Sequence, residues 1–531
     1  MRRWNGWGDD SDHYPLSEDA LAFVRERVGE SKPSKDATRD EVLRSVPESR
    51  LKGSATFKYD EATRVDHSRG QSLPDWLAMR YGRMGPFVDG VAFPTSHDEV
   101  AATLSEARKL GAIVIPYAGG TSVVGHLTAP IGDKPVASIS LEKMNKLAGI
   151  DERASIAGFG AGTPGPQVEA QLKQQGYVLG HFPQSYEYST IGGWVVTRSS
   201  GQQSLRYGRI ENLFASGRMI TPRGELVVGG HPASSAGPDL REAVMGSEGR
   251  FGILTEVNAR VRPLPEVDEF RAVFFPDWVS GIEAVRTMAQ ADLGLSMLRL
   301  SNEIETETQL ALVSGHRSAL QWLQRYLGMR GIGAGKCMLM IGITGAHRQV
   351  RRARGDAIVI ARKFGGVHVG KMMGAAWAKN RFRGPYLRNT LWDAGYAIDT
   401  VETSINWPKA TPLMRAIEQA AKDALAGENE RAHAFTHLSH VYRQGCSIYS
   451  TFVYRSTGSY EADFARWQRL KGKVSETIVS HGGTISHQHG VGADHAPYLP
   501  AEKGALGIDL IKAMARELDP TGMMNPGKLF A

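Results

Sequence analysis

Two glycine-rich stretches, PYAGGTSVVGH at 116–126 and HFPQSYEYSTIGGWVVTRSSG at 181–201, constrain the fold of this chain more than any other feature. Each sets a pair of glycines beside serine and threonine hydroxyls. Gly119 and Gly120 remove Cβ atoms where the backbone must reverse, and neighbouring hydroxyls and amides can hold a phosphate. One loop of this kind is as often only a turn. Two of them favour a dinucleotide over a mononucleotide.

Strand and helix patterns alternate around these stretches. A helix is predicted after Ser96, because the residues from 100 to 107 place apolar side chains on one face, and the strand-like run AIVIPYA follows it. The run SIAGFGAG is also strand-like, and a second helix starts at Pro164 and ends before Gly176. The pattern predicts two small α/β units.

Two prolines, Pro263 and Pro265, mark the first domain boundary. Beyond them, longer helical stretches such as RAIEQAAKDALAG alternate with strand-like runs such as CMLMIGIT and CSIYSTFVYR. The simplest interpretation is a mixed, mainly antiparallel sheet covered by helices. We therefore expect an α+β protein with an N-terminal arm at 1–60, a first domain at 61–265, a second domain at 266–495 and a C-terminal segment at 496–531.

Several motifs, in the expected order, resemble a known group of flavoproteins. PYAGGTSV, STIGGWVVTRSSG and MGSEGRFGILTEV at 245–257 resemble the FAD-binding modules of the p-cresol methylhydroxylase and vanillyl-alcohol oxidase superfamily. WNGWG at 4–8, FPTSHDEV at 93–100 and SHQHGVG at 486–492 extend the resemblance to the alkyldihydroxyacetonephosphate synthase family. The resemblance implies that 61–265 is a PCMH-type FAD-binding domain of two α/β subdomains, that 266–495 is the cap carrying the substrate side, and that 496–531 returns to the FAD domain.

The resemblance also implies which residues hold FAD. The loop at 118–123 would cradle the pyrophosphate and ribityl chain, and three later segments would hold the rest. The alternative, that these glycines only shape turns, is disfavoured by three matching segments in order. Thr121 stands where some relatives carry a histidine for covalent attachment, so we expect non-covalent FAD. The predicted cofactor-binding residues are Ala118, Gly119, Gly120, Thr121, Ser122, Val123, Gln184, Ser185, Ser189, Thr190, Gly193, Thr197, Arg198, Ser199, Ser200, Glu248, Gly249, Gly252 and Ile253.

Three residues of the second domain match functional positions of the family. Tyr449 matches the acid/base tyrosine; a free phenol titrates near ~10, so we expect cations to shift its pKa toward neutrality. The alternative is an ordinary hydrogen-bonded strand tyrosine. Arg388 falls at the substrate-binding arginine, and a guanidinium can clamp a phosphate or carboxylate. Arg299 also matches a family position, although pairing with Glu303 or Glu305 explains it equally well.

The motif SHQHG at 486–490 places His487 and His489 two residues apart, which puts both on one side of an extended chain and suits contact with one substrate. The family pattern has three consecutive histidines here, but this chain carries Gln488, which cannot shuttle a proton at neutral pH. We count all three as candidate catalytic residues. A metal is not expected, because no third and fourth ligand is evident, although His481 and His495 are near in sequence.

Two functions follow from the resemblance. The first is exchange of the acyl group of acyl-dihydroxyacetone phosphate for a fatty alcohol, without net redox. The second is an FAD-dependent dehydrogenase or oxidase of a 2-hydroxy acid or alcohol, which Gln488 and the NPGK tail favour. A flavin-binding protein without catalysis would leave Tyr449 and the histidines unexplained.

The composition limits the kinds of substrate and partner that we expect. The formal net charge is +7, but basic residues are scattered among acids, so we expect a small-molecule or lipid-like substrate and no nucleic acid. Two distant cysteines, Cys337 and Cys446, favour a cytoplasmic protein without disulfides. No window approaches the ~18 apolar residues of a spanning helix, so membrane contact would be peripheral. The superfamily suggests a homodimer.

Overall fold

The first predicted α/β unit is a three-stranded parallel sheet, present in a computed structural model that describes residues 2–312 and 317–530. The strand order is β1 (Gly90–Ala92), β3 (Val136–Ser140), β2 (Ile113–Tyr117), and helix α5 (His97–Lys109) connects β1 to β2. Ser96 caps α5 by accepting a hydrogen bond from Glu99 N, as its spacing predicts. The sheet delivers the loop at 118–123 directly after β2.

The second unit is a five-stranded antiparallel sheet of order β4-β5-β9-β7-β8. The helix α7, which follows β6, carries part of the second glycine stretch. A turn at Arg223 joins β7 to β8 as a hairpin. The elements are β4 (Leu147–Asp151), β5 (Ile156–Gly160), α6 (Gly165–Gln174), β6 (Tyr177–Val178), α7 (Ile191–Val196), α8 (Ser204–Tyr207), α9 (Ile210–Leu213), β7 (Phe214–Thr221), β8 (Gly224–Gly229), α10 (Arg241–Val244), β9 (Ile253–Arg260) and β10 (Arg262–Pro263).

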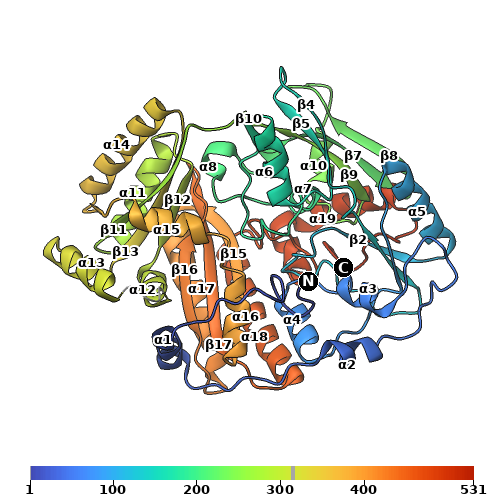
Figure 1. The fold of residues 1–531 in the computed structure, drawn as a ribbon, viewed down its shortest axis with the longest axis horizontal. Helices are drawn as coiled ribbons and strands as arrows, with labels where there is room; N and C mark the ends of the chain where they lie inside the picture. The colour runs from blue at the N-terminus through green and yellow to red at the C-terminus, as the bar shows by residue number, and fades with distance from the viewer. Residues whose placement is uncertain (1, 313–316, 531) are drawn as a thin grey trace.

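The other half of the molecule is built on a seven-stranded sheet of order β14-β11-β13-β12-β16-β17-β15 (Figure 1). Every pairing in it that the described residues form is antiparallel, so the sheet is less mixed than expected. The strands are β11 (Val267–Phe275), β12 (Met297–Ser301), β13 (Cys337–Gly345), β14 (Val367–His368), β15 (Tyr396–Asn406), β16 (His433–Leu438) and β17 (Gly445–Arg455).

Alternate side chains of these strands face two different environments. On β13, Leu339 and Ile341 join the core formed with α11 (Trp278–Gln290), α14 (His347–Lys363), α17 (Trp407–Ala426) and α18 (Tyr460–Ser480). Met338 and Met340 point the other way, toward α12 (Glu303–Leu312), α13 (Arg317–Met329) and α15 (Met372–Asn380). The period of two of a β-strand therefore separates a packed face from a face that is free to line a cavity.

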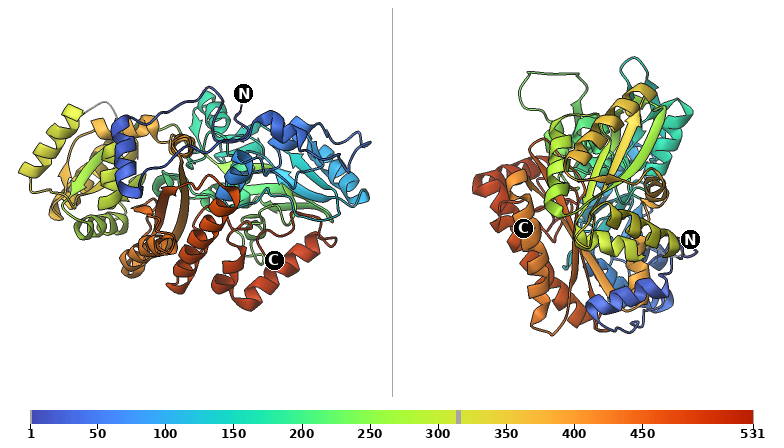
Figure 2. Two further views of the ribbon diagram at one scale, coloured as in Figure 1. Left: turned by 90° about the horizontal axis from the view of Figure 1, so that it is seen from below. Right: turned by 90° about the vertical axis from the view of Figure 1, so that its left-hand side faces the viewer.

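Both ends of the chain cross between the halves (Figures 1 and 2). Near the C-terminus, α19 (Leu499–Leu518) follows η1 (Ala496–Tyr498), and Met524 then forms a parallel bridge with Val114 of β2. The C-terminal segment thus packs on the half that carries the glycine loops. Near the N-terminus, α1 (Glu18–Val28) packs beside the seven-stranded sheet, and α2 (Arg39–Arg44), α3 (Glu61–Asp66) and α4 (Leu73–Arg80) follow.

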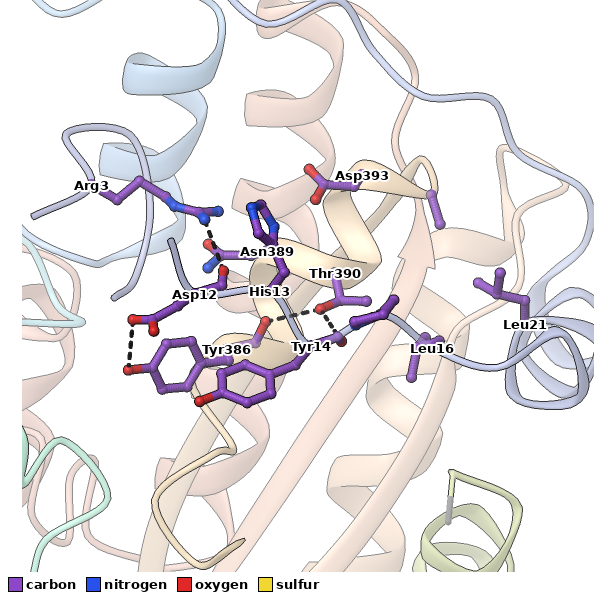
Figure 3. A pocket seen from close by; sticks show the side chains of 12 residues that line it. Arg3, Asp12, His13, Tyr14, Leu16, Leu21, Tyr386, Asn389, Thr390 and Asp393 are labelled. Atoms are coloured by element: carbon purple, nitrogen blue, oxygen red, sulfur yellow. Dashed lines mark hydrogen bonds between the residues drawn. The ribbon is translucent and has the colours of Figure 1, made fainter. Parts of the chain in front are cut away.

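The predicted outer arm is only partly an outer element, because Trp7 is buried at 4% exposure. Its backbone N–H donates to Asn389 Oδ1 at 3.1 Å and its carbonyl accepts from Asn389 Nδ2 at 2.7 Å, which ties it to α16 (Tyr386–Asp393). Arg2 also donates to the carbonyl of Gly119 at 2.6 Å. A small cavity of about 270 Å³ lies between this segment and α16, where the Tyr386 hydroxyl points toward Asp12 (Figure 3). The first residues therefore bridge a glycine loop and the seven-stranded half.

Candidate cofactor and active site

A cavity of about 1390 Å³ lies where the two halves meet. Its walls are the loop after β2, the segment around α7, the turn before β9, the open face of the seven-stranded sheet, and α12, α13, α15 and α16. A typical ligand pocket encloses about 300–1,000 Å³, so this cavity has room for a dinucleotide and a second molecule.

Nearly all predicted cofactor-binding residues line this cavity. They come together from three separate segments: Ala118, Gly119, Gly120, Thr121, Ser122, Val123, Gln184, Ser185, Ser189, Thr190, Gly193, Thr197, Ser199, Ser200, Glu248, Gly249, Gly252 and Ile253. Arg198 does not line it. Its guanidinium pairs instead with Glu242 at 2.8 Å and Glu211 at 3.2 Å.

The glycines of the first loop let the cradle segments pack closely together. At Gly119 a Cβ would collide with the carbonyl group of Tyr188, and Gly120 has a φ of +66°, which side-chain-bearing residues rarely adopt. The Ser200 hydroxyl is buried, lines the cavity and has no hydrogen-bond partner among the described residues. Close backbone, left-handed glycine and a spare hydroxyl are what a dinucleotide phosphate site requires.

The buried side chains of Glu248 and His126 connect two of these segments to the loop that carries the histidine motif. Glu248 Oε2 lies 2.8 Å from His126 Nε2, and His126 Nδ1 is hydrogen-bonded to Ser122 Oγ at 2.7 Å. The same carboxylate accepts from the backbone N–H groups of Val491 at 2.5 Å and Gly492 at 2.7 Å. The position of the histidine loop is therefore coupled to the cofactor cradle.

Tyr449 projects into the cavity from β17, because alternate residues of this strand belong to the packed core. Its ring stacks on His437 with centroids 4.9 Å apart. Burial raises the pKa of Tyr449 to about 12; Glu402 adds to the shift, and Thr400 and Arg388 oppose it. The predicted shift toward neutrality is wrong here, because loss of hydration outweighs the nearby cation.

Arg388 also reaches the cavity, from α16. Its guanidinium donates to the carbonyl of Gln71 at 2.5 Å, lies 3.6 Å from Asp399 and sits over the Trp76 ring at 5.4 Å. Burial lowers its pKa, although Asp399 works in the opposite direction. Asp399 is only within the outer range of an ion pair with Arg388. The guanidinium of Arg388 can therefore still bind an anionic ligand.

Arg299 lines the cavity from β12, and of its two predicted partners it pairs with Glu305, at 2.6 Å. Glu303 pairs with Arg415 instead. Although burial alone would raise the pKa of Glu305, Arg299 and His437 outweigh it and lower that pKa to about 2. His437 Nδ1 lies 3.0 Å from the same carboxylate.

The histidine motif does not form the extended strand that its spacing suggested. Gln488 and His489 line the cavity, whereas the His487 ring turns away and is hydrogen-bonded to the Tyr442 hydroxyl at 2.6 Å. Burial lowers the pKa of His489 despite the nearby carboxylate of Glu402. The two histidines therefore have different surroundings, and only one of them can touch a ligand in the cavity.

Glu402, a fully buried acid on β15 next to this motif, is not among the residues predicted from the sequence. Glu402, His440 and His487 are also the described group whose ligand atoms could hold a metal, all lying within 4.8 Å of one another. His440 Nδ1 already hydrogen-bonds Glu402 Oε1 at 3.3 Å. The expectation of no metal stays a prediction, as do the roles of the candidate residues. The sequence YAIDTVETSIN of β15 carries two acids, Asp399 and Glu402, and does not single out either one.

Comparison with known proteins identifies the family. Residues 264–529 match the model of the C-terminal domain of FAD linked oxidases, and residues 88–230 match that of the FAD binding domain. An alkyldihydroxyacetonephosphate synthase of Dictyostelium discoideum is 31% identical, over 89% of this chain and 78% of its own. This chain belongs to the alkyldihydroxyacetonephosphate synthase family. The synthase of Trypanosoma brucei brucei is 29% identical, over 99% of this chain and 92% of its own.

Solved structures agree with this family assignment. An alkyldihydroxyacetonephosphate synthase superposes with a TM-score of 0.81 at 26% identity, covering 99% of this chain and 98% of its own. A p-cresol methylhydroxylase, at 16% identity and a TM-score of 0.68, shares the fold. The predicted family, α+β fold and FAD cofactor are confirmed. This member of the synthase family is thus a flavoenzyme, and Thr121 in the cradle is consistent with FAD held without a covalent bond.

Replacement of Arg299 tests the buried pair with Glu305. Arg299→Gln leaves a buried carboxylate without its main partner, so we expect a loss of about 3–5 kcal/mol in the free energy of unfolding at pH 7. Because the pKa of Glu305 is lowered when folded, this advantage of the wild type is present above its ordinary pKa and shrinks as pH falls from about 4.5 toward about 2.

Urea denaturation from pH 7 down to the acid limit of the fold measures both effects. Arg286→Gln is the control, because Arg286 and its partner Glu283 are 35% and 40% exposed and its removal should cost about 1 kcal/mol or less. An equal loss in the two variants, or a loss at Arg299 that does not shrink with acid, would show that the ion pair does not stabilise the fold.

Proposed function

We propose that the protein exchanges the acyl group of an acyl-dihydroxyacetone phosphate for a long-chain alcohol, without net oxidation or reduction. The observation that carries this proposal is the combination of a polar and an apolar end in one cavity. Arg388, Tyr449 and His489 lie at the polar end. An amphiphile with an anionic head and a long chain matches this arrangement.

The apolar branch extends between the open face of the sheet and the helices α12, α13 and α15. It is lined by Met297, Leu310, Leu320, Leu323, Met338, Met340, Met372, Met373, Ala376 and Trp377. Methionine is flexible and polarisable, so a methionine-rich wall can adapt to chains of different shape. A small hydroxy acid would not need this branch, whereas two long chains would.

The residues at the polar end have distinct tasks in such an exchange. Arg388 anchors the phosphate by charge-assisted hydrogen bonds. Tyr449, whose raised pKa keeps it protonated at neutral pH, can donate a proton, and the neutral ring of His489 can accept one. The rings of Tyr449 and His489 meet edge to face, with centroids 5.9 Å apart. They thus form an adjacent donor and acceptor.

The exchange is balanced without a net change of oxidation state. The proton on the carbon that bears the acyl oxygen is acidified by the ketone, and a base such as His489 removes it. The electron pair left on the carbon passes to an electron acceptor, so that the bond from that carbon to the acyl oxygen can break and the carboxylate can leave with the pair of that bond. The alcohol oxygen bonds to the carbon and gives up its proton, and the carbon regains one. The electron pair returns to the carbon with that last proton. FAD, held by the cradle residues, would supply the electron-poor group that accepts the pair and gives it back.

A second candidate is an FAD-dependent dehydrogenase or oxidase of a 2-hydroxy acid or alcohol. The match of 264–529 to FAD linked oxidases favours it, as does a mitochondrial cytochrome-type D-lactate dehydrogenase of Arabidopsis thaliana that is 24% identical over 90% of this chain. Arg388 could then bind a carboxylate. In this case the cofactor would be reduced by each substrate molecule and reoxidised by an acceptor.

Anaerobic flavin absorbance separates the two reactions. We expect palmitoyl-dihydroxyacetone phosphate to perturb the oxidised band without bleaching it, and added hexadecanol to yield an ether product with release of palmitate. A panel of D-2-hydroxy acids should leave the spectrum unchanged. Bleaching by a hydroxy acid, with colour returning in air and no ether product, would replace the exchange reaction with the redox one.

Filling the apolar branch tests its use by the chain of the substrate. Leu323→Trp, on α13, adds bulk inside the branch, so we expect turnover of a palmitoyl substrate to fall about tenfold or more while a short-chain analogue is converted at the wild-type rate. Gln324→Trp is the matched control, because the neighbouring side chain is exposed. Equal losses for long and short chains would mean that the branch does not hold the chain.

We further propose a cytoplasmic homodimer with peripheral membrane contact through α13 and α15. Trp322 is 71% exposed, Met329 76% and Met372 82%, while Arg325 and Arg330 lie beside them. None of the helices in the described part of the chain has the length and apolarity to cross a bilayer. Sedimentation with anionic vesicles should deplete the wild type and spare Trp322→Ser/Met329→Ser; no depletion, or no difference between the two, would contradict this contact.

A further inference from the structure

One buried carboxylate, that of Glu402, lies behind side chains that line the polar end of the cavity. It is on β15 directly opposite Tyr449 of β17, and its side chain has no exposed surface. Of the residues of β15 that flank it, Val401 belongs to the packed core, and Thr403 is buried and donates to the carbonyl of Thr484 at 2.7 Å. Glu402 is therefore aimed at the site, although it does not itself line the cavity.

Five side chains converge on its two oxygens. Oε1 accepts from the Ser439 hydroxyl, hydrogen-bonds His440 Nδ1 at 3.3 Å and lies 3.1 Å from His487 Nδ1. Oε2 accepts from Gln488 Nε2 at 2.6 Å and lies 3.8 Å from His489 Nε2. Burial opposes ionisation of Glu402, but His487 and His440 outweigh it and hold its pKa well below the ordinary value. The group is a charged acceptor surrounded by donors.

His487 is held by this carboxylate and by Tyr442. Burial lowers the pKa of His487 to about 4, although Glu402 opposes the shift, so the ring is neutral and carries one proton. With that proton on Nδ1, facing Glu402, Nε2 is free to accept from the Tyr442 hydroxyl at 2.6 Å. The backbone N–H of His487 also donates to the carbonyl of Glu402 at 3.0 Å. His487 is thus part of the support and not of the cavity wall.

Gln488 connects the carboxylate to the cofactor cradle. Its Nε2 donates to Glu402, and its Oε1 accepts from the backbone N–H of Ser200 at 3.2 Å. Ser200 lines the cavity on the opposite half of the molecule. A side-chain amide offers a donor and an acceptor at one end, which is what a bridge between an anionic oxygen and a backbone N–H needs.

We propose that Glu402 is the positioning residue of the site: its charge orients the loop of His487, Gln488 and His489, and Gln488 transmits that order to the cofactor cradle at Ser200. His489 is then presented toward Tyr449 with a fixed ring orientation. In this arrangement Gln488 connects two parts of the site by hydrogen bonds and does not have to transfer a proton. The turnover part of this inference rests on the proposed function; the link to the cradle does not.

The charge of Glu402 is needed because a donor faces each of its oxygens, the Ser439 hydroxyl at Oε1 and the Gln488 amide at Oε2. In Glu402→Gln one oxygen becomes an NH₂ group, which faces either the Gln488 amide or the Ser439 hydroxyl and the imidazoles. Buried donors then oppose each other, and the loop must shift to relieve them. Gln488→Ala keeps the charge but removes the bridge to Ser200. The two substitutions interrupt one connection at different points.

The experiment compares Glu402→Gln, Gln488→Ala and the double variant as FAD-loaded holoenzymes. Turnover with palmitoyl-dihydroxyacetone phosphate and hexadecanol gives kcat and KM, and the rate of FAD release on dilution gives a readout that needs no substrate. Glu418→Gln is the matched control, because Glu418 is also buried and hydrogen-bonded, to Asn302 at 2.7 Å, but lies on α17 outside the cavity.

We expect Glu402→Gln to lower kcat about 10- to 100-fold with KM changed less than about threefold, and each single variant to speed FAD release. The double variant should lose less than the product of the single losses, because both break one connection. Glu418→Gln should match the wild type in kcat and FAD release. The proposal would be overturned if the double variant lost the full product of the single losses, or if FAD release were unchanged in the single variants. An equal loss of kcat in Glu418→Gln would also overturn it. If the wild type shows no exchange activity, the proposed function is wrong. The rate of FAD release then tests the positioning role of Glu402 by itself.

Discussion

The alternation of side chains across the seven-stranded sheet is the constraint on which the site depends. Leu339 and Ile341 of β13 join a core closed by long helices, so Met338 and Met340 must face the opposite side. The same parity sends Tyr449 of β17 into the cavity. Since a shift of one residue in register would exchange the two faces, the packing of the core on one side fixes the chemistry on the other.

Segments distant in sequence close the cavity around this face. The first residues tie Gly119 to α16 through Arg2 and Trp7, and the C-terminal segment reaches the parallel sheet at Val114. Glu248 binds the backbone after the histidine motif to the cofactor cradle. The cradle and the catalytic candidates are thus held by cross-links between the halves, so neither half alone presents the complete site.

Features that depend on the local backbone could be predicted from the sequence. Features that depend on side chains from distant segments could not. The glycine loops are recognisable because a close approach removes Cβ atoms, and all but Arg198 of the predicted cradle reach the cavity. His487 could not be placed, since its orientation is set by Tyr442 and Glu402, from other elements. The pKa of Tyr449 was predicted in the wrong direction, because sequence shows nearby cations but not the loss of water.

Loss of water governs the proton chemistry of this site as a whole. Burial raises the pKa of Tyr449, lowers that of His489 and lowers that of Arg388, so every one of these shifts favours the uncharged form. Glu402 is the exception, because donors surround it and keep it ionised. A neutral phenol beside a neutral imidazole can give and take protons without creating a lasting charge at a buried site. One fixed charge, placed behind them and away from the ligand, orients the pair without competing for the phosphate that Arg388 is suited to bind.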